Sequence, residues 1–446
     1  MPEGHPDAVD GAVRRPPVPR QQHRVAPQAA STAPASPAAA VSRRDRRVLI
    51  AALLLTGLSM RTAVTTVGAT LADIERGLHT NSGVAGVITT LPALCFAVLG
   101  ALAPRLASRS GPHRLLVLAL TAMTIGVVTR AFVSSVFAFL VLSVLSLAGA
   151  AIANVLMPTE VKTHFPDRIG AMTALYTTAM AVGTTAGAGL TVPIGSLAPG
   201  PDSWRVGIGS WALLSALAVV PWLAIAPRED RSGSAARRTP FGALVRSRTA
   251  WMVTLFFAFQ STQAYIAFGW FERFLTEHHI SDSTAGWMVA LMSAMAIPAS
   301  MIAPTVPQRH HRLLVVILGA AFAGAYAGMN AAPALSWLWM VLAGIGGGMF
   351  PLSLTLMGYR TATPTTTASL SAFAQGIGYS IAACGPVLFG ALRGATGGWA
   401  ASFTVLWVAV IAATIAGWLA SAPRTVDEDM QRMGTRHRED VSARAT

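Results

Sequence analysis

Long apolar stretches alternate with short polar connections along this chain. Twelve of the apolar stretches have about the twenty residues that an α-helix needs to cross the hydrocarbon layer of a membrane. The longest polar interval, Pro227–Thr249, divides them into two groups of six. The pattern therefore predicts an all-α polytopic membrane protein with twelve transmembrane helices. The predicted helices cover residues 48–70, 84–104, 114–131, 136–158, 170–194, 205–226, 250–272, 284–304, 312–330, 334–357, 368–392 and 399–421.

The two groups of six are related by an internal repeat. Ala85-Gly86 precedes Ala103-Pro104 in the second segment at the same spacing at which Ala285-Gly286 precedes Ala303-Pro304 in the eighth. The repeat predicts two pseudo-symmetric six-helix bundles, an arrangement typical of transporters that rock two halves about a central site. The predicted domains are a disordered cytoplasmic tail at 1–47, bundles at 48–226 and 250–421, a cytoplasmic linker at 227–249 and a cytoplasmic tail at 422–446.

Composition agrees with a membrane location. The chain is 53% hydrophobic and 12% charged, with a mean hydropathy of +0.53, whereas soluble domains carry about 25% charged residues. The net charge of +14 resides in loops and tails, where it suits anionic lipid headgroups and predicts no nucleic-acid partner. Residues 1–47 contain no apolar core of a signal peptide.

The distribution of basic residues predicts the orientation in the membrane. Fourteen arginines and lysines lie on the side that also holds both tails, against five on the other side. Because cytoplasmic loops are enriched in basic residues, both termini are predicted to be cytoplasmic.

Arg61 is the strongest candidate for a functional residue. It lies inside the first apolar segment, about fourteen residues past a basic cluster and so roughly 20 Å into a layer of about 30 Å. A charge at this depth costs several kcal/mol unless it faces protein or water. Gly57, Thr65 and Gly68 share its helix face. We expect this face to line a path for a negative or electron-rich solute, although an arginine that reaches to the outer surface is the alternative.

Other polar residues lie on helices expected to line a pore. Arg130 lies near the outer interface, where it either reaches to the headgroups or guides an anion. Asn154, one turn before Pro158, either bonds backbone freed by the proline or contacts solute. Taken alone, a glutamine in such a helix is more often a bond between helices than a ligand. The remaining predicted substrate-binding residues, on the fifth, seventh and eleventh segments, are Tyr176, Gln260, Gln263, Gln375 and Tyr379.

Acidic groups and histidines are absent from the middle of every apolar segment. Glu160 and Glu272 touch segment ends, and the histidines fall in predicted loops or tails. If a carboxylate couples protons to transport, we expect it to be Glu272, which otherwise serves as a solvated interfacial charge. No nucleotide-binding motif, metal-ligand spacing or nucleophile–base pair appears. We therefore expect a protein that is not an enzyme and that has no cofactor and no metal site.

Six short strings along the apolar part of the chain stand out: Arg61–Gly68 (RTAVTTVG), Leu91–Phe96 (LPALCF), Gly126–Arg130 (GVVTR), Ala150–Pro158 (AAIANVLMP), Val161–Pro166 (VKTHFP) and Ala174–Tyr176 (ALY). They resemble the major facilitator superfamily, and within it the cyanate-permease and 2-nitroimidazole-transporter family. The resemblance covers residues 48–420 and implies a secondary transporter with two six-helix halves. Ser108 stands where the superfamily's loop between helices two and three normally has Asp, which weakens the expectation of the usual cytoplasmic charge latch.

The sequence leaves three functional readings open. The first is a secondary transporter of a small anionic or electron-rich polar solute, cyanate-like or nitroheterocycle-like. The second is a broad-specificity drug efflux transporter of the same fold, and the third is a membrane sensor or scaffold, for which the tails are short. We expect the first, working as a monomer among membrane lipids in the plasma membrane of a bacterium.

Overall fold

The computed structural model describes residues 43–80, 82–198, 200–226 and 241–432. Most of the predicted tail at 1–47, most of the predicted linker and the end of the second tail lie outside this part. The described residues form α-helices, short 3₁₀ turns and brief connections. The helices of the first half are α1 (Arg43–Ala69), α2 (Leu71–Gly77), α3 (Ser82–Ser110), α4 (Pro112–Arg130), α5 (Val136–His164), α6 (Ile169–Ser196), α7 (Ser203–Ser210) and α8 (Ala212–Ile225).

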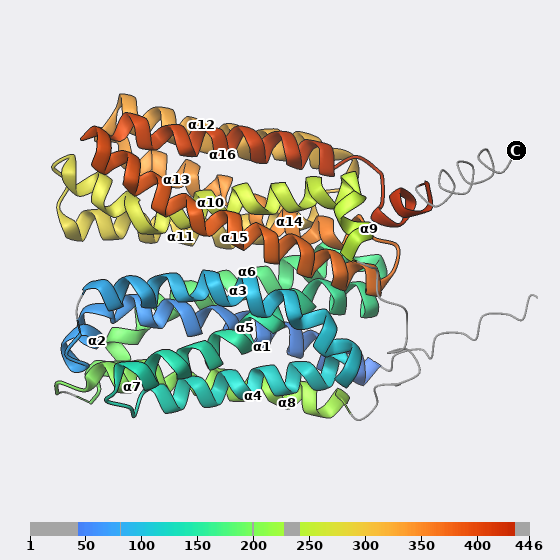
Figure 1. Cartoon of the computed structure of the whole chain (residues 1–446), viewed down its shortest axis with the longest axis horizontal. Helices are drawn as coiled ribbons and strands as arrows, with labels where there is room; N and C mark the ends of the chain where they lie inside the picture. The colour runs from blue at the N-terminus through green and yellow to red at the C-terminus, as the bar shows by residue number, and fades with distance from the viewer. Residues whose placement is uncertain (1–42, 81, 199, 227–240, 433–446) are drawn as a thin grey trace, which may run out of the picture. The chain divides into compact units, whose positions relative to one another are not determined.

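The second half repeats this order. Its helices are α9 (Phe241–Arg246), α10 (Arg248–Glu277), α11 (Asp282–Ile302), α12 (His311–Ala331), α13 (Ser336–Gly346), α14 (Met349–Tyr359), α15 (Pro364–Thr396) and α16 (Trp399–Ala420). Every predicted segment corresponds to a helix, and the sixth and tenth are each divided in two, as α7 with α8 and α13 with α14. The all-α fold of two six-helix bundles is confirmed: α1 to α8 form one bundle and α10 to α16 the other (Figure 1).

Ten of the twelve segments in the described chain are long and apolar enough to cross a membrane by composition alone. The other two, α6 and α10, carry runs of small and polar residues such as Gly183-Thr-Thr185 and Gln260–Gln263. Many large apolar side chains elsewhere are exposed, among them Leu118 at 60% and Trp287 at 69%. Exposed apolar side chains on long helices face lipid in a membrane protein, so the protein spans the membrane several times.

Hydroxyl side chains within the helices find acceptors in their own backbone. Thr66 donates to the carbonyl of Thr62 at 2.7 Å, and Thr254 donates to that of Ala250 at 2.7 Å. Ser247 and Thr363 accept backbone N–H bonds at the starts of α10 and α15. Because lipid offers no hydrogen bonds, these local contacts allow polar residues to remain in spanning helices.

The chain begins α1 and ends α16 at one end of the helices, which we call the tail end, and the opposite end is the far end (Figure 1). The two bundles meet toward the tail end. Thr177 on α6 donates to the carbonyl of Ser300 on α11 at 3.5 Å. Gly170, at the start of α6, lies so close to the 3₁₀ turn Ala303–Thr305 after α11 that an added Cβ would lie 2.2 Å from the carbonyl oxygen of Pro304. Only glycine permits this approach of two backbones, so the bundles are closed together at the tail end.

The facing surfaces of α1 and α10 are open at the far end. Gly68 on α1 and Gly269 on α10 are exposed, and a Cβ added at either would meet nothing within 4 Å. Phe268 is 55% exposed. The space between the halves is therefore reached from the far end and sealed at the tail end.

Residues after α16 fold back onto the second bundle. Asp429 accepts hydrogen bonds from Ser247 Oγ at 2.8 Å and from the backbone N–H of Thr249 at 3.0 Å. Burial opposes the charge of Asp429, but these bonds outweigh it and hold the pKa of this carboxyl below its usual range. Asp427 accepts bonds from the N–H of Ala362 and from Thr366 Oγ1. The predicted tail at 422–446 thus begins with a docked segment that reaches the first turns of α10 and α15.

Candidate functional site

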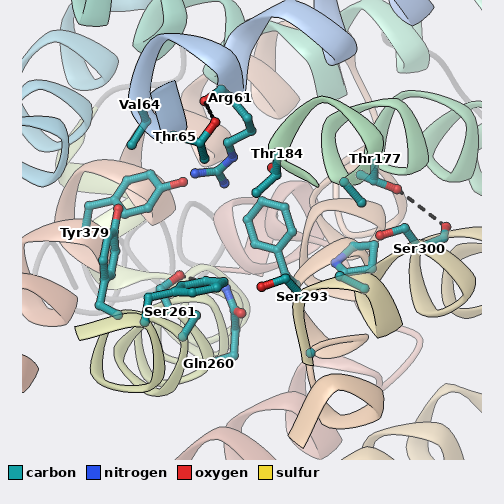
Figure 2. A pocket seen from close by; sticks show the side chains of 18 of the residues that line it. Arg61, Val64, Thr65, Thr177, Thr184, Gln260, Ser261, Ser293, Ser300 and Tyr379 are labelled. Carbon is teal, nitrogen blue, oxygen red and sulfur yellow. Dashed lines mark hydrogen bonds between the residues drawn. The ribbon is translucent and has the colours of Figure 1, made fainter. Parts of the chain in front are cut away.

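A cavity of about 200 Å³ lies between the two bundles. Both halves contribute to its wall, since α1 and α6 belong to the first bundle and α10, α11, α12, α14 and α15 to the second. Figure 2 shows side chains from these helices converging on one space. The polar residues of the lining are Arg61, Thr65, Thr177, Thr184, Gln260, Ser261, Tyr265, Ser293, Ser300 and Tyr379.

Arg61 supplies the only formal charge among the lining residues, and none of them is acidic. Its side chain projects from α1 into the cavity, where the guanidinium faces the hydroxyl of Tyr379 (Figure 2). The guanidinium carbon lies 5.8 Å from the ring centre of Phe96 and 5.4 Å from that of Phe350. Aromatic faces stabilise a cation without neutralising it. The cavity therefore keeps a net positive charge that is available to a solute.

Aromatic rings form much of the remaining wall. Tyr265, Phe268, Phe322 and Phe350 line the cavity together with Tyr379. The rings of Tyr265 and Tyr379 meet edge to face with centres 6.3 Å apart. A flat solute would find apolar surface on several sides and a single cationic group at one edge, with hydroxyl and amide groups to set its orientation.

A hydrogen-bond network that crosses between the bundles holds Tyr379 in place. Asn154 Nδ2 on α5 donates to Gln375 Oε1 at 2.5 Å and to the hydroxyl of Tyr379 at 3.4 Å. Gln375 in turn donates to Ser371 Oγ at 2.7 Å, and Ser371 donates to the carbonyl of Val155 at 2.8 Å. The network is buried. It links α5 to α15 on the side of the cavity nearer the tail end, and it fixes the position of Tyr379, whose hydroxyl faces Arg61.

Four of the predicted substrate-binding residues line the cavity: Arg61, Thr65, Gln260 and Tyr379. Asn154 and Gln375 lie behind the wall and support Tyr379. Gln263 is buried inside the second bundle, where its Oε1 accepts a bond from the hydroxyl of Tyr326 at 2.9 Å. Binding roles for all of these residues stay predictions.

Three further candidates lie away from the cavity lining. Arg130 is fully buried and donates from Nη2 to the carbonyl of Ala63 at 3.1 Å and to Thr66 Oγ1 at 3.3 Å. It therefore braces α4 against α1 and does not reach the headgroups in this conformation. Tyr176 is buried on α6, where its backbone carbonyl approaches Gly57. Glu272 is exposed and forms no ion pair within the described residues. Its coupling role stays a prediction.

The sequence did not single out Tyr265, Phe268, Phe322 or Phe350. A signal for two of them existed, because Ser261, Tyr265 and Phe268 continue the face of α10 that begins at Gln260. The expectation that the histidines lie in loops or tails was wrong for three of them. His113 lies in the first turn of α4, His164 ends α5 and His311 begins α12, and His113 and His311 are buried.

Comparison with known proteins identifies the family. The sequence profile of the Major Facilitator Superfamily matches residues 53–386, which is most of the chain. The chain belongs to the major facilitator superfamily. Its members are transporters, so this protein is a transporter of the superfamily and not an enzyme.

Two transporters of Escherichia coli (strain K12) are similar along most of their length. The 2-nitroimidazole transporter is 30% identical over 382 residues, covering 84% of this chain and 95% of its own. The cyanate transport protein CynX is 27% identical over 353 residues, covering 78% and 91%. The solved structure of the proton:xylose symporter XylE superposes with a TM-score of 0.67 at 12% identity, covering 87% of this chain and 98% of XylE. The superposition shows the shared major facilitator fold.

Proposed function

We propose that this protein carries a small anion, or a small electron-rich planar solute, across the membrane by alternating access. The observation that supports the proposal is Arg61, a cation in a cavity whose lining contains no acidic residue. A carboxylate-, cyanate- or nitro-type oxygen at the guanidinium would form a charge-assisted hydrogen bond in a place of low dielectric constant. The names of the two relatives contain 2-nitroimidazole and cyanate, and both compounds are solutes of this kind.

The alternative, broad drug efflux, fits the cavity less well. The volume of about 200 Å³ lies below the range of about 300–1,000 Å³ that is typical of sites for drug-sized ligands. A cationic drug would also need a carboxylate, and the lining offers a guanidinium instead. Of the features of the cavity, only its aromatic side chains favour broad drug efflux.

A binding screen with purified protein tests the proposal. We expect cyanate, small carboxylates or 2-nitroimidazole to raise the unfolding temperature in detergent, because a ligand that binds only the folded state stabilises it by mass action. Quaternary ammonium drugs and neutral sugars serve as matched comparisons. Stabilisation by the cations alone, with no response to any small anion or nitroheterocycle, would contradict the proposal and favour efflux.

We also propose that the protein resides in the plasma membrane of a bacterium with both termini in the cytoplasm. The basic loops support this orientation, since Arg105, Arg109 and Arg114 border a connection at the tail end. The cavity, which opens at the far end, then faces outward.

Reporter fusions are expected to show this orientation directly. An alkaline-phosphatase reporter, active only outside the cytoplasm, should be inactive after Thr446 and active when inserted at Gly200 in the connection at the far end. A cytoplasmic reporter such as a fluorescent protein should give the reverse pattern and controls for expression. Equal phosphatase activity at both positions would show that the orientation is wrong.

A further inference from the structure

Three side chains that bind metal ions in many proteins meet at the tail end of the first bundle. His113 is the second residue of α4, while Glu160 and His164 lie on the last turns of α5. The side chains are 8%, 2% and 15% exposed, respectively. None of the three lines the central cavity.

The ligand atoms converge on the carboxylate. His113 Nε2 lies 3.1 Å from Glu160 Oε2, and His164 Nδ1 lies 3.6 Å from the same oxygen. One nitrogen from each ring and the carboxylate oxygen all lie within 4.8 Å of one another. In a tetrahedral zinc site, bonds of about 2.0–2.1 Å place neighbouring ligand atoms roughly 3.3 Å apart. The two carboxylate distances bracket this value, and His164 Nδ1, which also lies 3.3 Å from the backbone carbonyl oxygen of Glu160, would turn toward His113 Nε2 to bind an ion.

The surroundings restrict how the ligands can move. The ring of His113 packs against Trp222 of α8 with centres 5.6 Å apart, and against His164 with centres 5.2 Å apart. Glu160 and His164 are one helical turn apart, so both face α4. His164 is the most exposed of the three side chains, so an ion would approach the cluster past its ring.

We propose that His113, Glu160 and His164 form a binding site for a divalent transition-metal ion, with zinc as the best fit. Two imidazoles and one carboxylate favour zinc, cobalt or nickel over magnesium and calcium, which prefer oxygen ligands. The ion would join α4 to α5 at the closed end of the bundle. The proposal does not depend on the transported solute.

Zinc binding to the purified full-length protein tests the site. The protein is isolated with a tag that contains no histidine, treated with chelator and then titrated with Zn²⁺. We expect one zinc ion per chain and a rise in unfolding temperature that Mg²⁺ does not produce. His164→Gln and Glu160→Gln are expected to weaken the zinc affinity about tenfold or more. Co²⁺ should give the visible absorption of a tetrahedral site in the wild type and not in these two variants.

Two further variants separate a metal site from an ion pair that merely holds the helices together. His164→Cys replaces one zinc ligand by another, so we expect it to bind zinc more tightly than His164→Gln. If the three side chains formed only an ion pair between the helices, cysteine would give no such recovery. His310→Gln, at an exposed histidine elsewhere, should leave the zinc response unchanged. The proposal is overturned if Zn²⁺ neither binds nor stabilises the wild type. Equal affinity in the wild type and His164→Gln would also overturn it, since zinc would then bind elsewhere.

Discussion

Arg61→Ala is expected to lower the initial rate of transport of an anionic solute by at least about tenfold while the protein continues to fold. The guanidinium is the only charged group of the cavity lining. A charge-assisted hydrogen bond to a solute is worth about 1.5–3 kcal/mol, and every 1.4 kcal/mol corresponds to about a factor of ten. Folding should tolerate the change, because removing a cation that has no acidic partner in the cavity also removes its desolvation cost.

The measurement compares uptake into proteoliposomes with the elution profile and unfolding temperature of the same preparations. Arg61→Lys is the matched control for charge: it keeps the cation but loses the planar fork that faces Tyr379, so we expect an intermediate rate. A well-folded Arg61→Ala protein that transports at the wild-type rate would remove Arg61 from the site and withdraw the main support for an anionic solute.

Gly170→Val is expected to abolish most transport through a different step. A Cβ at residue 170 would lie 2.2 Å from the carbonyl oxygen of Pro304, and that oxygen belongs to backbone that cannot rotate away. Overpacking of this kind costs about 1–3 kcal/mol, and here the cost falls on the state that is closed at the tail end. The equilibrium should therefore shift toward the state open at the tail end by up to about two orders of magnitude.

Gly189→Val is the matched control, because residue 189 lies on the same helix and an added Cβ there meets nothing within 4 Å. We expect normal transport from this variant. In Gly170→Val with Cys95 and Cys384 replaced by Ala, a cysteine placed at the exposed residue Gly68 should react less with a membrane-impermeant thiol reagent added at the far end, since that end should now be closed more of the time. Unchanged transport and unchanged labelling would show that Gly170 is not part of the closing contact.

The length of the apolar segments and the position of a residue within a segment predicted the features that depend on a single helix. Segment length predicted the twelve spans, and the depth of Arg61 predicted its place in the cavity, because both follow from the rise per residue of one helix. The rotation of a helix is harder to predict. Gln260 and Gln263 are both predicted to bind substrate, yet Gln260 lines the cavity and Gln263 bonds Tyr326 inside the bundle. Both glutamines lie within one turn, so polarity alone does not tell which side faces the cavity.

Features that depend on contacts between distant segments could not be predicted. Asn154 and Gln375 are 221 residues apart, and their bond exists only because α5 and α15 pack across the two bundles. His113 and Glu160 are 47 residues apart, a spacing that matches no metal-ligand motif. Arg130 is predicted near the outer interface from its own helix, but its bonds to Ala63 and Thr66 require the packing of α4 on α1.

The docked residues after α16 have a consequence for the order of synthesis. Asp429 bonds Ser247 and Thr249, which precede it by 182 and 180 residues, and Asp427 bonds Ala362 and Thr366, which precede it by 65 and 61. The first turns of α10 and α15 are thus synthesised long before the carboxylates that accept their hydrogen bonds. Until translation reaches Asp427 and Asp429, these donors bond to water or lipid headgroups. Shortening the chain ahead of residue 427 would leave the first turns of both helices permanently without these carboxylate acceptors.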